Sequence, residues 1–223
     1  MNMSGQEKNG LNRQQFARLM ADQVNFIVAA QPSEFQTSAA AEPHPIPGFD
    51  NAIVFPGAFN PLHDGHLAMA RLASKRLQRP LWFEISVENV DKPILDFVEV
   101  ANRTHQVHHP HGMILTRTPT FEQKSKVFAG CIFVVGADTI ARLNEPRYYK
   151  NDARARDASM QTIAENDCRF LVFPRKQYNI ASAGSNFQAG GLAPPLDALC
   201  EFISVDEFCM EISSTDIRSR QQN

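Results

Sequence analysis

Two histidines, His63 and His66, stand three residues apart where an apolar run gives way to an amphipathic pattern. The apolar run ends at Phe55, and apolar residues at helical spacing begin at Leu67. A helix N-terminus presents N–H groups without intrahelical acceptors and the positive end of the helix dipole, which favour an anion such as phosphate. Gly65, between the histidines, has no Cβ, so a ligand can approach the backbone closely. We therefore expect both imidazoles to point at one phosphate-bearing ligand.

The segment that carries these histidines reads Gly57-x-Phe59-Asn-Pro-x-His63-x-Gly65-His66. It resembles the HxGH signature of the α/β nucleotidylyltransferases, a superfamily that also includes the class I aminoacyl-tRNA synthetases. The resemblance implies that His63 and His66 are catalytic and contact phosphates, with His66 near the α-phosphate. It also implies that Gly57, Phe59 and Gly65 help to bind the nucleotide.

A second segment, Ile212-Ser-Ser-Thr-Asp-Ile-Arg218, resembles the ISSTxIR motif of the same superfamily. In that motif a serine, a threonine and an arginine hold the triphosphate tail. The two motifs are about 150 residues apart, the length of one doubly wound domain. The resemblance implies that Arg218 is catalytic and that the nucleotide is bound by Ser213, Ser214 and Thr215.

A third segment contains Gly136-Ala-Asp138 and resembles the strand end that meets the ribose in nicotinate and nicotinamide mononucleotide adenylyltransferases. The resemblance covers about residues 51–218 and is closest to a cytidylyltransferase-like branch near those enzymes. Relatives there carry an Asn-x-Asp-Lys-Pro segment, which matches Asn89 to Pro93 here. We expect Gly136 and Asp138 to bind the nucleotide, and Lys92 and Arg175 to bind the phosphate of the acceptor substrate.

Strands and helices alternate along most of the chain. We predict strands near 51–56, 81–87, 112–117, 131–136, 169–174 and 202–205, and helices near 65–78, 94–108, 121–129, 138–144, 152–166 and 214–220. Near-continuous apolar strands in such an alternation predict an α/β fold, a doubly wound Rossmann-like parallel sheet with helices on both faces. Ligands of such sheets bind at the carboxyl ends of strands where the strand order reverses, and the HxGH and Gly136–Asp138 turns both follow predicted strands.

The first 50 residues read differently from the rest. Residues 11–30 place Phe16, Leu19, Met20, Val24 and Ile27 on one helical face, which predicts an amphipathic helix packed on the domain or on a partner subunit. Residues 31–50 are typical of a linker. We therefore divide the chain into an N-terminal helix and linker, 1–50, and a nucleotidylyltransferase domain, 51–223. Residues 177–195, rich in Gly and Pro, predict a long, mobile loop.

Composition narrows the class of protein. The net charge of −2 argues against generic nucleic-acid binding, and no long apolar run predicts a membrane span. The four cysteines form no CxxC pair, and we interpret them as reduced core residues of a cytoplasmic protein. The histidines at 105, 108, 109 and 111 lack the cysteine and carboxylate spacing of a zinc site, and no protein metal ligand is predicted.

The sequence predicts an enzyme that joins a nucleoside triphosphate, ATP, to a phosphate acceptor, nicotinamide or nicotinate mononucleotide, in NAD biosynthesis. Pyrophosphate would leave, and Mg²⁺ would be held by the nucleotide and water. Expected partners are therefore the triphosphate and a small phosphorylated acceptor. The sequence leaves open whether the protein forms a homo-oligomer. The chain lacks, in the region after Gly136–Asp138, the tryptophan that stacks on the pyridine ring in nicotinate-type relatives, and Tyr148 or Tyr149 could stack there instead. A cytidylyltransferase, a phosphopantetheine adenylyltransferase and a non-catalytic nucleotide-binding regulatory protein remain as alternatives.

Overall fold

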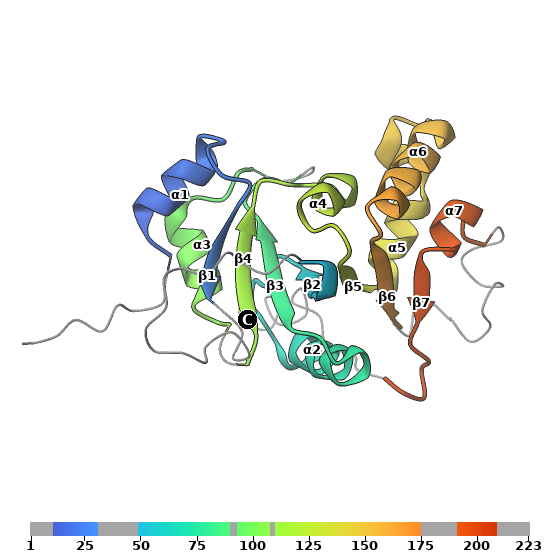
Figure 1. The fold of residues 1–223 in the computed structure, drawn as a ribbon, viewed down its shortest axis with the longest axis horizontal. Coiled ribbons are helices and arrows are strands. Elements are labelled where there is room, and N and C mark those ends of the chain that lie inside the picture. Colours follow the sequence, from blue (N-terminus) through green and yellow to red (C-terminus); the bar gives the residue numbers. More distant parts are fainter. Residues whose placement is uncertain (1–10, 31–48, 90–92, 108–109, 175–190, 209–223) are drawn as a thin grey trace, which may run out of the picture.

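A computed structural model of the chain describes residues 11–30, 49–89, 93–107, 110–174 and 191–208. Within these residues seven strands form one sheet in the order β1-β4-β3-β2-β5-β6-β7 (Figure 1). The strands are β1 (Phe26–Ala30), β2 (Ile53–Pro56), β3 (Leu81–Ser86), β4 (Gly112–Thr116), β5 (Ile132–Gly136), β6 (Arg169–Phe173) and β7 (Cys200–Phe202). All neighbouring strands are parallel except β1 and β4, which are antiparallel.

Helices cover both faces of this sheet. They are α1 (Arg13–Met20), α2 (Asp64–Leu77), α3 (Phe97–Thr104), α4 (Phe121–Val127), α5 (Ala137–Asn144), α6 (Ala153–Glu165) and α7 (Pro194–Asp197), with 3-10 turns η2 (Phe49–Asn51) and η3 (Pro146–Tyr149). In the view of Figure 1, α2 lies below the strands and α4 and α6 lie above them. The predicted doubly wound α/β fold is confirmed.

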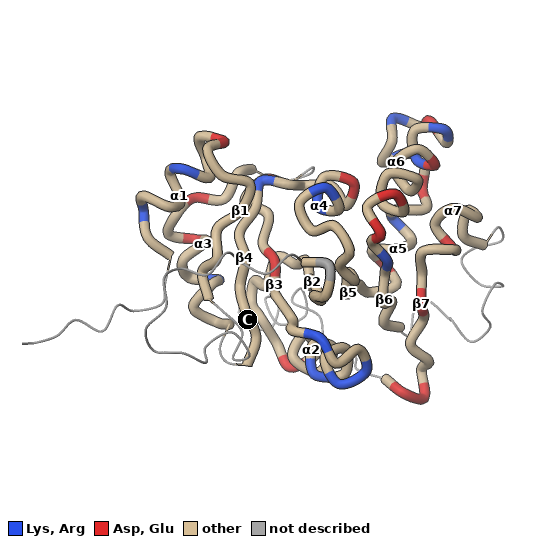
Figure 2. Tube along the Cα trace, in the orientation of Figure 1, with Lys and Arg blue, Asp and Glu red and all other residues tan. Residues whose placement is uncertain are grey.

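The core has two layers because successive strand residues point to opposite faces of the sheet. Ile53 and Phe83 belong to one buried cluster, and Val54 and Trp82 belong to the other. Charged residues lie mostly on helices and loops rather than on strands, and Glu84 in the middle of β3 is an exception (Figure 2). The near-continuous apolar strands of the sequence are therefore buried on both sides, as in other parallel sheets.

The prediction of one helix over 11–30 is wrong in its second half. The helix α1 ends at Met20, and Phe26–Ala30 form the edge strand β1, in which Ile27 pairs with Leu115 of β4. Phe, Ile and Val favour a strand, and the outer edge of β4 offers unsatisfied backbone groups to pair with. A segment placed before the predicted domain thus contributes a strand to the sheet of that domain.

The other predicted elements within the described residues are present, with shifted ends. The predicted helix over 94–108 is the shorter α3, and the strand predicted at 202–205 is β7, which begins at Cys200. The short helix α7 occupies the end of the predicted loop over 177–195. Most of that loop and the predicted helix over 214–220 lie outside the described residues.

Candidate active site

The two histidines lie at the start of α2, as the sequence predicts. His63 is the N-cap residue, with an extended backbone, and His66 is the third residue of the helix. The backbone N–H of His63 donates to Nδ1 of His66 at 3.4 Å, and the two imidazole rings stack with centroids 3.7 Å apart. With Nδ1 as acceptor, the neutral His66 ring carries its proton on Nε2. That N–H is a donor that could meet a phosphate oxygen.

A cavity of about 150 Å³ opens beside these histidines, between the carboxyl ends of β2 and β5. The strand order of the sheet reverses between these two strands, since β3 and β4 continue on one side and β6 and β7 on the other. Ligands of open α/β sheets bind at such a reversal. The lining residues are Phe55, Pro56, His63, Gly65, His66, Met69, Val135, Gly136, Asp138, Thr139, Phe173, Pro174 and Phe208.

Five of the predicted site residues therefore meet in one place. His63, Gly65 and His66 come from the turn after β2, and Gly136 and Asp138 come from the turn after β5. Gly136 is the N-cap of α5, and a Cβ added there would lie 2.8 Å from Oδ1 of Asp138. The absence of a side chain at Gly136 thus leaves room for the Asp138 carboxylate at the cavity wall.

Gly57 and Phe59 do not line the cavity. The Phe59 ring is only 1% exposed and packs edge-on against His66, with centroids 5.1 Å apart. A Cβ at Gly57 would lie 2.5 Å from the Phe59 ring, so glycine is needed for this ring to occupy its place. The Phe59 ring thus supports His66, Gly57 leaves room for that ring, and neither residue lines the cavity.

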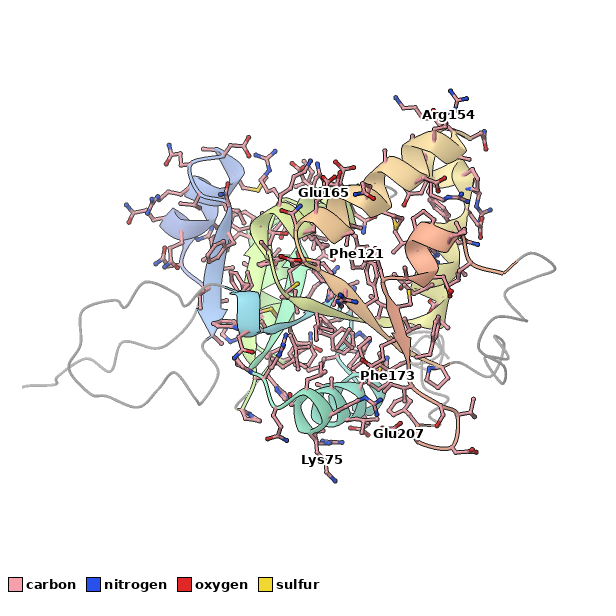
Figure 3. The ribbon with its side chains drawn as sticks, turned by 45° about the vertical axis from the view of Figure 1, so that its right-hand side comes forward. Lys75, Phe121, Arg154, Glu165, Phe173 and Glu207 are labelled. Carbon is pink, nitrogen blue, oxygen red and sulfur yellow. The ribbon has the colours of Figure 1, made fainter. Side chains whose placement is uncertain are left out.

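Two aromatic residues that line the cavity were not predicted from the sequence. They are Phe173 at the end of β6 and Phe208, whose rings pack edge-on with centroids 4.9 Å apart. Figure 3 shows Phe173 and Glu207 beside α2, where Glu207 pairs with Arg76 at 3.0 Å. The carboxyl-end position of Phe173 is a signal that could have identified it, whereas no local pattern marks Phe208.

The remaining predicted site residues lie outside the described residues. They are Lys92, Arg175, Ser213, Ser214, Thr215 and Arg218. Their roles stay predictions from the sequence motifs.

Neither of the two candidate stacking residues, Tyr148 and Tyr149, lines the cavity. Both belong to the η3 turn, which follows the C-terminal end of α5, whereas Asp138 lies at the N-terminal end of that helix. Burial raises the pKa of the Tyr149 phenol, and a hydrogen bond with Ser159 of α6 partly offsets this rise. Neither tyrosine is therefore placed to stack on a ring bound within this cavity.

Within the described part of the chain, His111, Cys131 and Cys168 pack in the protein core. The His111 ring is buried edge-on against Phe83, with centroids 5.5 Å apart. Cys131 and Cys168 are free thiols in the core, with their sulfur atoms 3.9 Å apart. Among the described residues, no three His, Cys, Asp or Glu side chains gather as a metal site, and no helix is long and apolar enough to cross a membrane.

The mostly parallel sheet reverses its strand order beside the histidine-bearing N-terminus of α2, an arrangement typical of nucleotide-binding α/β proteins. The profile of the cytidylyltransferase-like family matches residues 54–220, and the chain belongs to this family. No curated protein shows significant similarity to the chain. Membership makes the protein a nucleotidyltransferase by family and implies nucleotide substrates.

Proposed function

We propose that this protein is an adenylyltransferase that joins ATP to nicotinamide or nicotinate mononucleotide and releases pyrophosphate. The observation that carries the proposal is the meeting of His63, His66 and Asp138 in one cavity at the reversal of the sheet. The paired histidines suit a triphosphate, and the Gly136–Asp138 turn resembles the ribose contact of mononucleotide adenylyltransferases.

The acceptor phosphate attacks the α-phosphorus of the triphosphate, a new P–O–P bond forms, and the bond to the β-phosphate breaks. This reaction needs no protein nucleophile, because the enzyme has to align two anions and neutralise the charge that builds on the bridging oxygen. The Nε2–H of His66 would donate to an α-phosphate oxygen. Backbone N–H groups in the first turn of α2 would add to this positive field.

The triphosphate tail would extend toward the second motif. Ser213, Ser214 and Thr215 would donate hydroxyl hydrogen bonds to the β- and γ-phosphates, and Arg218 would add a planar, charged fork. Lys92 and Arg175 would bind the phosphate of the acceptor. Mg²⁺ would arrive with the nucleotide, bound by phosphate oxygens and water. This suits a cavity in which Asp138 is the one acidic side chain among the described lining residues.

A cytidylyltransferase is the second candidate, favoured by the family profile that the chain matches. The two candidates differ in the base that the site accepts and in the acceptor. Two further alternatives are a phosphopantetheine adenylyltransferase and a nucleotide-binding regulatory protein without turnover. One experiment can distinguish all four functions.

The test is a matrix of purified protein, Mg²⁺, ATP or CTP, and one acceptor at a time, with pyrophosphate release as the readout. The acceptors are the two pyridine mononucleotides, phosphopantetheine and a sugar phosphate. We expect pyrophosphate with ATP and a pyridine mononucleotide. Turnover only with CTP or only with another acceptor would replace the substrate assignment. Absence of pyrophosphate in every reaction, together with triphosphate binding measured by calorimetry, would favour the regulatory protein.

A further inference from the structure

The loop that leads into the HxGH histidines is held from outside by the end of α3. This loop runs from Gly57 to Leu62, and the side chain of Gln106, in the turn directly after α3, bridges two of its backbone groups. The N–H of Leu62 donates to Oε1 of Gln106 at 2.8 Å, and Nε2 of Gln106 donates to the carbonyl of Phe59 at 3.3 Å.

Arg103, which lies within α3 itself, binds the loop one residue before Phe59. The guanidinium of Arg103 donates to the carbonyl of Ala58 at 2.9 Å and pairs with Glu99 on its own helix. Arg103 is itself only 8% exposed. Three backbone groups between residues 58 and 62 are thus bound by side chains more than 40 positions later in the chain.

The residue at the centre of this loop has a backbone that needs such support. Phe59 has a φ of 43°, a left-handed conformation that is costly for a residue with a bulky side chain. Such conformations persist where the surroundings over-determine them. Here the carbonyl of Phe59 accepts from Gln106, while its ring is buried against Phe83, with centroids 5.0 Å apart, and against His66.

We infer that Gln106 is a positioning residue for the two histidines, acting through the loop between Phe59 and Leu62. Its amide binds the backbone on both sides of the Asn60–Pro61 peptide. Leu62 directly precedes His63, and the Phe59 ring contacts the His66 ring. Loss of the Gln106 amide would therefore release both histidines at once. The inference rests on the proposed phosphate-binding role of these histidines.

The chain offers a matched control. Asn144, the last residue of α5, makes the same pair of bonds to a different loop: it accepts from the N–H of Ala193 at 2.8 Å and donates to the carbonyl of Gly191 at 3.1 Å. None of these three residues lines the cavity. A comparison of Gln106→Ala with Asn144→Ala therefore separates the loss of two hydrogen bonds from the loss of histidine positioning.

The experiment measures three quantities on each variant of the full chain: the unfolding midpoint, the affinity for Mg-ATP and Mg-CTP by calorimetry, and the histidine ring signals in ¹H–¹⁵N spectra. His63→Ala and His66→Ala spectra assign the ring signals. We expect Gln106→Ala and the control Asn144→Ala to lose similar stability. Gln106→Ala should weaken triphosphate binding about tenfold, the scale of one net hydrogen bond, and should shift the ring signals of both histidines. Asn144→Ala should change neither.

The inference is overturned if Gln106→Ala keeps wild-type triphosphate affinity and wild-type ring signals while losing as much stability as Asn144→Ala. Should Gln106→Ala fail to fold, Gln106→Met keeps the length and bulk of the side chain without its hydrogen bonds and is measured instead. If the wild-type protein binds neither triphosphate, the proposed function fails, and the ring signals alone still decide whether Gln106 positions the histidines.

Discussion

The imidazole rings of His63 and His66 stack nearly parallel, with centroids 3.7 Å apart and 20° between the ring planes. This geometry arises because the N-cap and the third helical position lie on the same side of the first turn of α2. Both rings consequently face one cavity, where two donors can contact the same phosphate chain. The stacked pair is expected to act as a unit, so removal of either ring should disturb the other.

His66 is expected to matter most for turnover. His66→Ala removes the group that we propose to lie nearest the reacting phosphate and should lower turnover by about 10²-fold or more, the scale of one preorganised electrostatic contact. Steady-state pyrophosphate release measures the loss, and circular dichroism checks that the fold is intact. Near-normal turnover in a folded His66→Ala protein would contradict the assignment.

Arg218 is expected to bind the β- and γ-phosphates. Arg218→Ala should therefore weaken the binding of ATP much more than the binding of AMP, because AMP lacks the phosphates that the guanidinium would grip. Calorimetry with both ligands on the wild-type and variant proteins gives the two ratios. Equal losses for ATP and AMP would place Arg218 away from the triphosphate tail.

Lys92 is expected to bind the phosphate of the acceptor. A lysine ammonium can hold a phosphate as a point charge, so Lys92→Ala should raise the KM for the acceptor and leave ATP binding unchanged. The acceptor KM from pyrophosphate release and the ATP affinity from calorimetry provide the comparison. A lysine that only faces solvent would leave both quantities at their wild-type values.

A buried ion pair beneath α4 should dominate the stability of that helix. Nζ of Lys124 lies 2.7 Å from both carboxylate oxygens of Glu84, and these residues are 4% and 1% exposed. Burial lowers the pKa of the Lys124 ammonium, while the Glu84 carboxylate opposes that shift. Lys124→Met should cost about 3–5 kcal/mol of unfolding free energy, because it leaves a buried carboxylate without its counter-ion.

Denaturant unfolding of a double-mutant cycle tests this expectation. The variant that combines Lys124→Met with Glu84→Gln carries no buried charge and should recover most of the loss. A double variant as unstable as the sum of the two single variants would mean that the pair contributes no coupling.

Cys200 should resist alkylation in the folded protein. Burial, with a smaller effect of Asp197, raises the pKa of the Cys200 thiol to about 12 from its ordinary value near 9. At pH 9 the folded protein should react slowly with iodoacetamide at Cys200, and denatured protein should react readily. Peptide mass spectrometry at fixed times measures both rates.

The same shift sets the direction of a pH effect on stability. Because the folded state favours the neutral thiol, its contribution to stability is present below pH 9 and is lost as the pH rises toward 12. Cys200→Ala should therefore lose less stability than the wild type between these values. Equal losses would show that Cys200 does not titrate as burial implies.

The sequence by itself determined the parts of this protein that local patterns encode. The apolar run before Pro56 and the helical spacing after Leu67 placed β2 and α2 within two residues of their ends. The alternation of such units implied a parallel sheet with helices on both faces, because parallel strands need crossover connections. His63 and Asp138 were therefore expected near each other, since each lies in a turn after a parallel strand and the carboxyl ends of these strands meet at one edge of the sheet.

Only the tertiary structure decided which segments became partners over long distances. Residues 26–30 are apolar enough for a helix or a strand, and the free edge of β4 selected the strand. In the sequence Lys124 resembles any surface lysine, yet in the fold its ammonium forms a buried ion pair with Glu84 of β3. Gln106 reads as an ordinary polar residue after a helix, and its role depends on a loop more than 40 positions earlier. Each of these contacts joins segments that are far apart in the chain, and no local sequence pattern identifies the partner of either segment.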